Sequence, residues 1–233
     1  MTTVLLVRHG RTTANGAGVL AGWTEGVGLD DAGREQVKAL AGRLRPLPLA
    51  ALVASPLQRC QETVEGLLAA REDSPDLHRD ERVGEVRYGD WSGQELKALA
   101  EDPLWQVVQH HPSAVVFPGP GGESMAAMQQ RAVAAVREWN SRLGPDALYV
   151  VVSHADVIKA VLADALGMHL DQFQRIVVDP ASVSVVRYTS LRPFVLRVND
   201  VGGDLSAVVP SASGEAESGA DAVVGGGAGG PLP

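Results

Sequence analysis

The chain has 233 residues, of which 45% are hydrophobic, and its 20 basic and 28 acidic residues give a net charge of -8. This length favours one globular domain with a full core. The acidic balance argues against a nucleic-acid-binding face and against a polybasic membrane anchor, so an anionic ligand would need a local cluster of positive groups.

The first ten residues, MTTVLLVRHG, hold an apolar run that is too short for a signal peptide or a membrane span. We therefore expect a cytoplasmic protein with no membrane partner. The single cysteine, Cys60, permits no internal disulfide and fits a reducing compartment. Because it falls inside an expected helix, we interpret it as a buried structural residue.

Three short apolar runs predict strands, at residues 4–7, 51–54 and 148–152. They alternate with longer segments of helical pattern, which is typical of a parallel sheet covered on both faces. The sequence therefore predicts an α/β fold, a three-layer sandwich in which helices flank a mostly parallel central sheet.

Two helices are expected in the first third of the chain. The first runs from about 31 to 44 and is capped by Asp30 or Asp31. The second follows the strand at 51–54, and its start has a complete capping pattern: Ser55 as N-cap, Pro56 at the first helical position and Gln58 closing a capping box.

The second half predicts two more helices, at 125–142 and 155–166, and then strands between about 174 and 199. Residues 209–233 are rich in glycine, serine and alanine, and such a composition cannot repay the entropy of ordering. We expect one domain over residues 1–208 and a disordered tail over 209–233.

Basic residues and histidines follow each of the three predicted strands. Arg8 and His9 follow the first, Arg59 the second and His154 the third. Ligands of open α/β sheets bind beyond the carboxyl ends of the strands, where helix N-termini also converge. Guanidinium groups match the equatorial oxygens of a phosphoryl group, and a neutral imidazole can accept that group covalently. The pattern predicts phosphoryl transfer.

Five segments stand out in chain order: LVRHGRTTAN at 6–15, SPLQRCQET at 55–63, VGEVRYGDWSG at 83–93, PGPGGES at 118–124 and VVSHADVIKAVL at 151–162. They resemble the motifs of the histidine phosphatase (phosphoglycerate-mutase-like) superfamily. The whole sequence most closely resembles an actinobacterial branch of phosphomutases, some of whose members look like acid phosphatases that form dimers.

The resemblance implies a role for each matching residue, and a homodimer. The catalytic set would be His9 as nucleophile, Glu85 as proton donor, and Arg8, Arg59 and His154 as ligands of the phosphoryl group. Further substrate-binding residues would be Asn15, Gly22, Trp23, Glu123 and Ser124, although Glu123 and Ser124 could equally be a helix cap with an acidic first turn.

We expect a phosphomonoester hydrolase that acts on a small phosphorylated metabolite through a phosphohistidine, without metal or cofactor. Three alternatives stay open: a phosphoglycerate-type mutase, a dinuclear metallohydrolase that uses the histidines as ligands, and a non-catalytic member that binds a phosphorylated ligand. Residues 92–124 hold one lysine among several acidic residues, which disfavours the mutase. The substrate itself would be chosen by pocket walls within 16–30 and 94–124.

Overall fold

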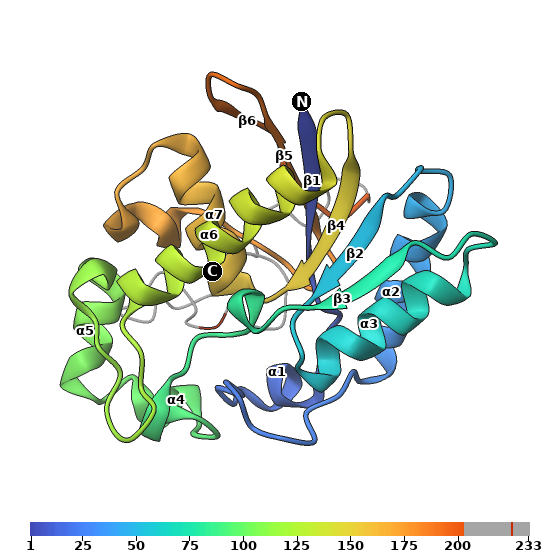
Figure 1. Ribbon diagram of the computed structural model, residues 1–233. Helices are drawn as coiled ribbons and strands as arrows, with labels where there is room; N and C mark the ends of the chain where they lie inside the picture. The colour runs from blue at the N-terminus through green and yellow to red at the C-terminus, as the bar shows by residue number, and fades with distance from the viewer. Residues whose placement is uncertain (203–224, 226–233) are drawn as a thin grey trace, which may run out of the picture.

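The computed structural model describes residues 1–202 and residue 225. With the exception of Gly225, the expected tail at 209–233 lies outside these described residues. A six-stranded sheet of order β3-β2-β4-β1-β5-β6 forms the centre of the molecule (Figure 1).

The first four strands of the chain are parallel and the last two are antiparallel to their neighbours. This confirms the α/β class with a mostly parallel sheet. The strands are β1 (Thr2–Arg8), β2 (Ala51–Ala54), β3 (Asp76–Arg79), β4 (Leu148–Ser153), β5 (Val183–Tyr188) and β6 (Pro193–Asp200).

Helices cover both faces of the sheet (Figure 1). On one face lie α2 (Asp31–Leu44) and α3 (Gln58–Ala69), and on the other lie α6 (Met125–Leu143) and α7 (Ala155–Leu166). The remaining short helices are α1 (Thr13–Ala17), α4 (Leu96–Leu99), α5 (Pro103–His110) and four 3-10 turns, η1 (Glu81–Val83), η2 (Gly89–Trp91), η3 (Pro112–Ala114) and η4 (Leu170–Arg175).

The alternation of side chains along β1 divides the core into two layers. Val4 and Leu6 belong to the larger apolar cluster, with α6 and α7, whereas Leu5 and Val7 belong to the cluster under α2 and α3. Because both faces of the strand are buried, its sequence is an uninterrupted apolar run. This explains why the central strands were recognisable from sequence.

Helix α2 has the predicted limits, and the carboxylate of Asp30 accepts a hydrogen bond from the Gly33 amide at 2.7 Å. The predicted start of α3 is wrong. This helix begins at Gln58, with Leu57 at the N-cap position and no side-chain cap. The Ser55 hydroxyl lies instead 2.8 Å from Nε2 of His154, so tertiary structure uses the side chain that the local pattern assigned to a cap.

The strands expected between 174 and 199 are confirmed only in part. β5 and β6 form, but the segment before them begins in η4 and continues without regular structure to residue 182. The edge strand β3 was not predicted, because its sequence DLHR has no apolar alternation and is mostly exposed. Within residues 1–202 no helix is long and apolar enough to span a bilayer.

Candidate active site

The carboxyl ends of β1, β4 and β2 lie side by side at one edge of the sheet. Arg8 pairs with Ser153 in the β1–β4 register, and Ala54 pairs with Val152 in the β2–β4 register. His9 and His154 are the next residues after β1 and β4, and their ring centroids lie 5.2 Å apart. Strand register therefore brings together two histidines that are 145 positions apart in the sequence.

His9 is buried and is neutral at physiological pH. Desolvation, the largest cause, and the positive charges of Arg59 and Arg8 hold the pKa of its imidazole well below the ordinary value. Its Nδ1 lies 2.8 Å from the Gly10 carbonyl oxygen, which can only accept a hydrogen bond, so Nδ1 carries the proton. Nε2 consequently keeps its lone pair, as a nucleophile requires.

Two buried arginines provide the positive charge of the site. The Arg59 Nη2 atom donates to the Gly22 carbonyl at 2.9 Å, and the Arg8 Nη1 atom donates to the Val178 carbonyl at 2.8 Å. Burial lowers the pKa of Arg8 to about 10, which still leaves it charged at neutral pH. Gly22 has a φ of 51°, in the left-handed region that favours glycine, and this conformation directs its carbonyl at Arg59.

His154 is also buried and neutral, because desolvation and then the charge of Arg59 hold its pKa well below the ordinary value. Nε2 of His154 lies 2.8 Å from the Ser55 hydroxyl, which also accepts a hydrogen bond from the Leu57 amide at 3.3 Å. Its other ring nitrogen, Nδ1, makes no hydrogen bond to any described residue and lies 3.7 Å from Oε2 of Glu85. This nitrogen is therefore available to a ligand.

Glu85 is 4% exposed, and burial together with the nearby Asp156 raises the pKa of its carboxyl to about 7. Arg59 and Arg8 act in the opposite direction but do not outweigh these two causes. The sequence could not decide this competition, because it depends on how completely water is excluded. A carboxyl with this pKa can donate a proton near neutral pH and take one back.

The backbone of Glu85 is fixed by two side chains from other segments. The Trp23 indole donates to its carbonyl oxygen at 2.7 Å, and Nη2 of Arg131 donates to the same oxygen at 2.9 Å. Arg131 is paired in turn with Glu123, and its Nη1 atom also donates to the carbonyls of Arg82 and Gly84. Sequence reasoning missed Arg131, which lies in a long alanine-rich helix with no motif to mark it.

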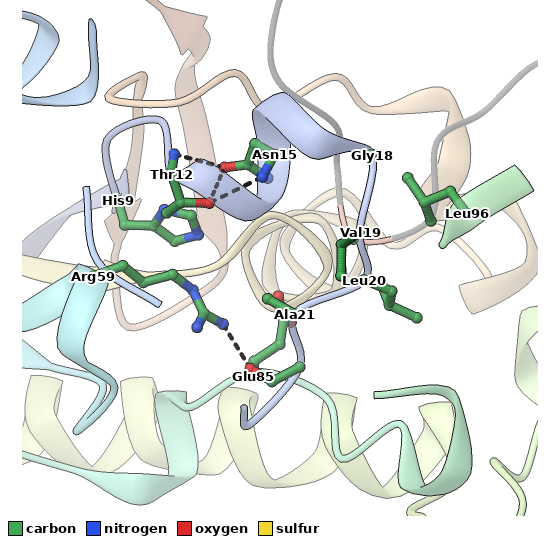
Figure 2. A pocket seen from close by; sticks show the side chains of 12 residues that line it. His9, Thr12, Asn15, Gly18, Val19, Leu20, Ala21, Arg59, Glu85 and Leu96 are labelled. Atoms are coloured by element: carbon green, nitrogen blue, oxygen red, sulfur yellow. Dashed lines mark hydrogen bonds between the residues drawn. The ribbon is translucent and has the colours of Figure 1, made fainter. Parts of the chain in front are cut away.

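Some of the site residues expected from sequence line a common pocket, and others lie outside its lining. His9, Asn15, Gly22, Arg59 and Glu85 line one pocket (Figure 2). Trp23 donates to the backbone of Glu85, and Glu123 pairs with Arg131, which donates to the same carbonyl. Ser124 is the N-cap of α6 and accepts from the Ala127 amide. The other lining residues are Thr12, Gly18, Val19, Leu20, Ala21, Leu96 and Gly225.

Asn15 is held in place by the start of α1. Its Oδ1 accepts hydrogen bonds from the amide and the hydroxyl of Thr12, and the Thr12 hydroxyl accepts in return from the Asn15 amide (Figure 2). With its oxygen occupied, Asn15 has only its NH₂ group to present to a ligand. An amide donor suits an anion.

Cys60 is fully buried, and desolvation raises the pKa of its thiol to about 12. A thiol with this pKa is not a nucleophile at neutral pH. Within residues 1–202 no group of three or more histidine, cysteine, aspartate or glutamate side chains is arranged to hold a metal ion.

Comparison with known proteins agrees with this geometry. The profile of the histidine phosphatase superfamily (branch 1) matches residues 4–201. The chain belongs to this superfamily. Phosphoserine phosphatase 1 of Hydrogenobacter thermophilus is 30% identical over 207 residues, which cover 85% of this chain and 92% of that protein. Together with relatives of the same kind, this similarity identifies the chain as a phosphatase of the superfamily.

Two further similarities extend the comparison. The solved structure of Bacillus stearothermophilus YhfR superposes with a TM-score of 0.77 at 26% identity, over 86% of this chain and 98% of that one. A 2,3-bisphosphoglycerate-dependent phosphoglycerate mutase of Gloeobacter violaceus is 25% identical over 77% of this chain and 82% of that protein. The superfamily member described here therefore has both phosphatases and mutases among its relatives.

Proposed function

We propose that this phosphatase hydrolyses a small phosphorylated metabolite in two steps, through a phosphohistidine at His9. In the first step Nε2 of His9 attacks phosphorus, the bond to the ester oxygen breaks, and Glu85 protonates that oxygen. In the second step Glu85 takes a proton from water, which attacks phosphorus and releases phosphate and neutral His9. One observation carries the proposal: Nδ1 of His9 donates its proton to the Gly10 carbonyl, which leaves Nε2 free to attack in a pocket that Glu85 also lines.

Positive charge and N–H donors stabilise the equatorial oxygens in both steps. Arg8 and Arg59 supply guanidinium groups, and the neutral ring of His154 supplies a further donor in the tautomer that carries its proton on Nδ1, for which the described residues offer no hydrogen-bond partner. All three are buried, so their interactions with a dianionic group are little screened by water. Asn15 adds its amide from the start of α1.

The experiment that tests this function is replacement of the nucleophile. We expect His9→Ala to lower the hydrolysis of p-nitrophenyl phosphate by on the order of 10⁴-fold or more, as for other catalytic groups that act as a unit. The matched control is His110→Ala, an exposed histidine of α5, which should keep full activity. A phosphoenzyme that is stable in base and labile in acid is expected with the native chain. Substantial activity of His9→Ala would contradict the proposal.

A phosphoglycerate-type mutase is the second candidate, favoured by the mutase relative. A mutase must retain a bisphosphorylated intermediate, for which its pocket needs additional cations. Among the described lining residues Arg59 is the one lysine or arginine, and the nearby walls are formed by Val19, Leu20 and Leu96. This wall favours release of the product over its return to the phosphoenzyme.

The two functions are separated by incubating the protein with 3-phosphoglycerate, with and without 2,3-bisphosphoglycerate. We expect free phosphate to form faster than 2-phosphoglycerate in both cases. Isomerisation that outpaces phosphate release would establish the mutase instead. We further propose that the protein acts in the cytoplasm as a homodimer, which gel filtration with light scattering would test.

A further inference from the structure

A buried polar cluster surrounds Asp156, whose charge helps to raise the pKa of Glu85 but which itself transfers no proton and binds no phosphoryl oxygen in the two chemical steps. Asp156, in the first turn of α7, is 1% exposed, and its Oδ2 accepts a hydrogen bond from the Tyr88 hydroxyl at 2.9 Å. Its other oxygen, Oδ1, makes no hydrogen bond to any described residue, and the ammonium of Lys159 lies 3.7 Å from it. A carboxylate removed from water in this way is costly unless donors surround it.

One further donor reaches Asp156 from the pocket itself. The amide of Gly225 donates to Oδ2 at 3.1 Å, and the carbonyl oxygen of Gly225 accepts from Nη2 of Arg8 at 3.5 Å. Gly225 lines the same pocket as His9 and Glu85. Gly225 thus presents a donor to Asp156 and an acceptor to Arg8. Its amide nitrogen and its carbonyl oxygen are separated by three covalent bonds.

We propose that Asp156 determines specificity by accepting a hydrogen bond from an ammonium or hydroxyl group carried by the substrate close to its phosphoryl group. In the substrate complex a phosphoryl oxygen occupies the place of the Gly225 oxygen at Arg8, and the donor occupies the place of the Gly225 amide at Asp156. The inference rests on the proposed function, since it takes Arg8 as a ligand of the phosphoryl group.

The alternative role for Asp156 is purely structural, as the partner of Tyr88 and Lys159. The two roles predict different effects on a series of substrates. A structural role affects all substrates alike, because loss of packing does not depend on which ester is bound. A recognition role changes the ratio between a substrate that has a donor and one of the same shape that lacks it. This ratio does not depend on the fraction of folded enzyme.

The test compares kcat/KM for three esters of similar shape: 2-aminoethyl phosphate, 2-hydroxyethyl phosphate and n-propyl phosphate. We expect the native protein to prefer at least one donor-bearing ester over the propyl ester by roughly tenfold or more, the effect of a hydrogen bond to a charged group. The aminoethyl and hydroxyethyl arms show whether the donor is an ammonium or a hydroxyl. Equal values for all three esters would overturn the inference.

The substitution Asp156→Asn should reduce that preference to within about threefold of unity, because the amide offers a weaker acceptor of nearly the same shape. Tyr88→Phe is the matched control: it removes a neighbour of the same oxygen but keeps the carboxylate, so the preference should persist. Calorimetric binding of the three esters to Asp156→Asn gives the same ratio without turnover. A preference that survives Asp156→Asn would overturn the inference.

The proposed function can fail separately. Hydrolysis of p-nitrophenyl phosphate that does not need His9 would remove the phosphohistidine mechanism, whatever the ester preference is. Conversely, His9-dependent hydrolysis with no preference among the three esters would keep the mechanism and remove the role of Asp156.

Discussion

Burial and neighbouring guanidinium groups fix the protonation of the residues that carry the chemistry. His9 and His154 stay neutral because desolvation and Arg59 oppose the imidazolium form. The pKa of Glu85 is shifted in the opposite direction, upward, because desolvation of a carboxyl favours its neutral form. The same buried environment thus prepares a neutral nucleophile and a protonated acid at one pH.

The pH dependence of the first step follows from these protonation states. Glu85 is a competent acid while protonated, so kcat/KM for an alkyl phosphate should fall about tenfold per pH unit above a pKa of about 7. The neutral nucleophile is retained across this range because the pKa of His9 is lowered. The measurement is a pH profile for n-propyl phosphate, corrected for ionisation of the ester itself.

Glu85→Gln should remove this alkaline limb and lower the rate for n-propyl phosphate by roughly 10²- to 10⁴-fold. The kcat/KM for p-nitrophenyl phosphate, which reports the first step alone, should fall much less, because nitrophenolate leaves without a proton. Equal losses for the two esters would contradict the role of Glu85 as the proton donor.

At the scale of elements, α6 positions the acid through one side chain. The Arg131 side chain donates to three backbone carbonyls of one short segment, those of Arg82, Gly84 and Glu85. It also forms an ion pair with Glu123. The loop between η1 and η2 has no regular structure of its own at Glu85. The loop therefore depends on the helix for its conformation.

We expect Arg131→Ala to lower the melting temperature by about 5–10 °C, because several partly buried hydrogen bonds to a charged group are lost together. Activity should fall in parallel as Glu85 loses its anchor. The matched control is Arg137→Ala on the same helix, whose pairing with Asp164 is exposed and should be worth less than about 1 kcal/mol. The measurements are thermal unfolding and steady-state assays of both variants. Equal losses of melting temperature and activity in the two variants would disprove the anchoring role.

For the whole molecule, the superfamily profile ends at residue 201, close to the end of β6. Gly225 lies beyond this boundary but contacts Arg8, Asp156 and the pocket. These contacts place one residue from beyond the matched region at the position where we expect the substrate. A residue in that position competes with the ligand.

Deletion of residues 210–233 should therefore leave the melting temperature within a few degrees of the native value, while lowering KM by roughly two- to tenfold at unchanged kcat, since a tethered competitor is removed. Differential scanning calorimetry and initial rates with p-nitrophenyl phosphate test both parts. The substitution of Gly225 alone is the matched control for the effect on KM. A large fall in melting temperature would show that this segment contributes to stability.

The sequence alone determined the central strands, four long helices and the order of the catalytic motifs. It did so because doubly buried strands are apolar throughout and because strand ends with arginine and histidine mark an anion site. The edge strand β3 and the start of α3 were not predictable, since the first has little burial and Ser55 contacts a residue 99 positions away.

Only the tertiary structure decided the electrostatics and the contacts across segments. The pKa of Glu85 reflects desolvation and the charges of Asp156, Arg59 and Arg8, which come from separate elements. Residues far apart in the sequence also meet where Trp23 and Arg131 anchor Glu85, and where Asp156 accepts a hydrogen bond from Gly225. Local pattern encodes burial and capping, whereas such pairings exist only once the sheet has fixed which strand ends are neighbours.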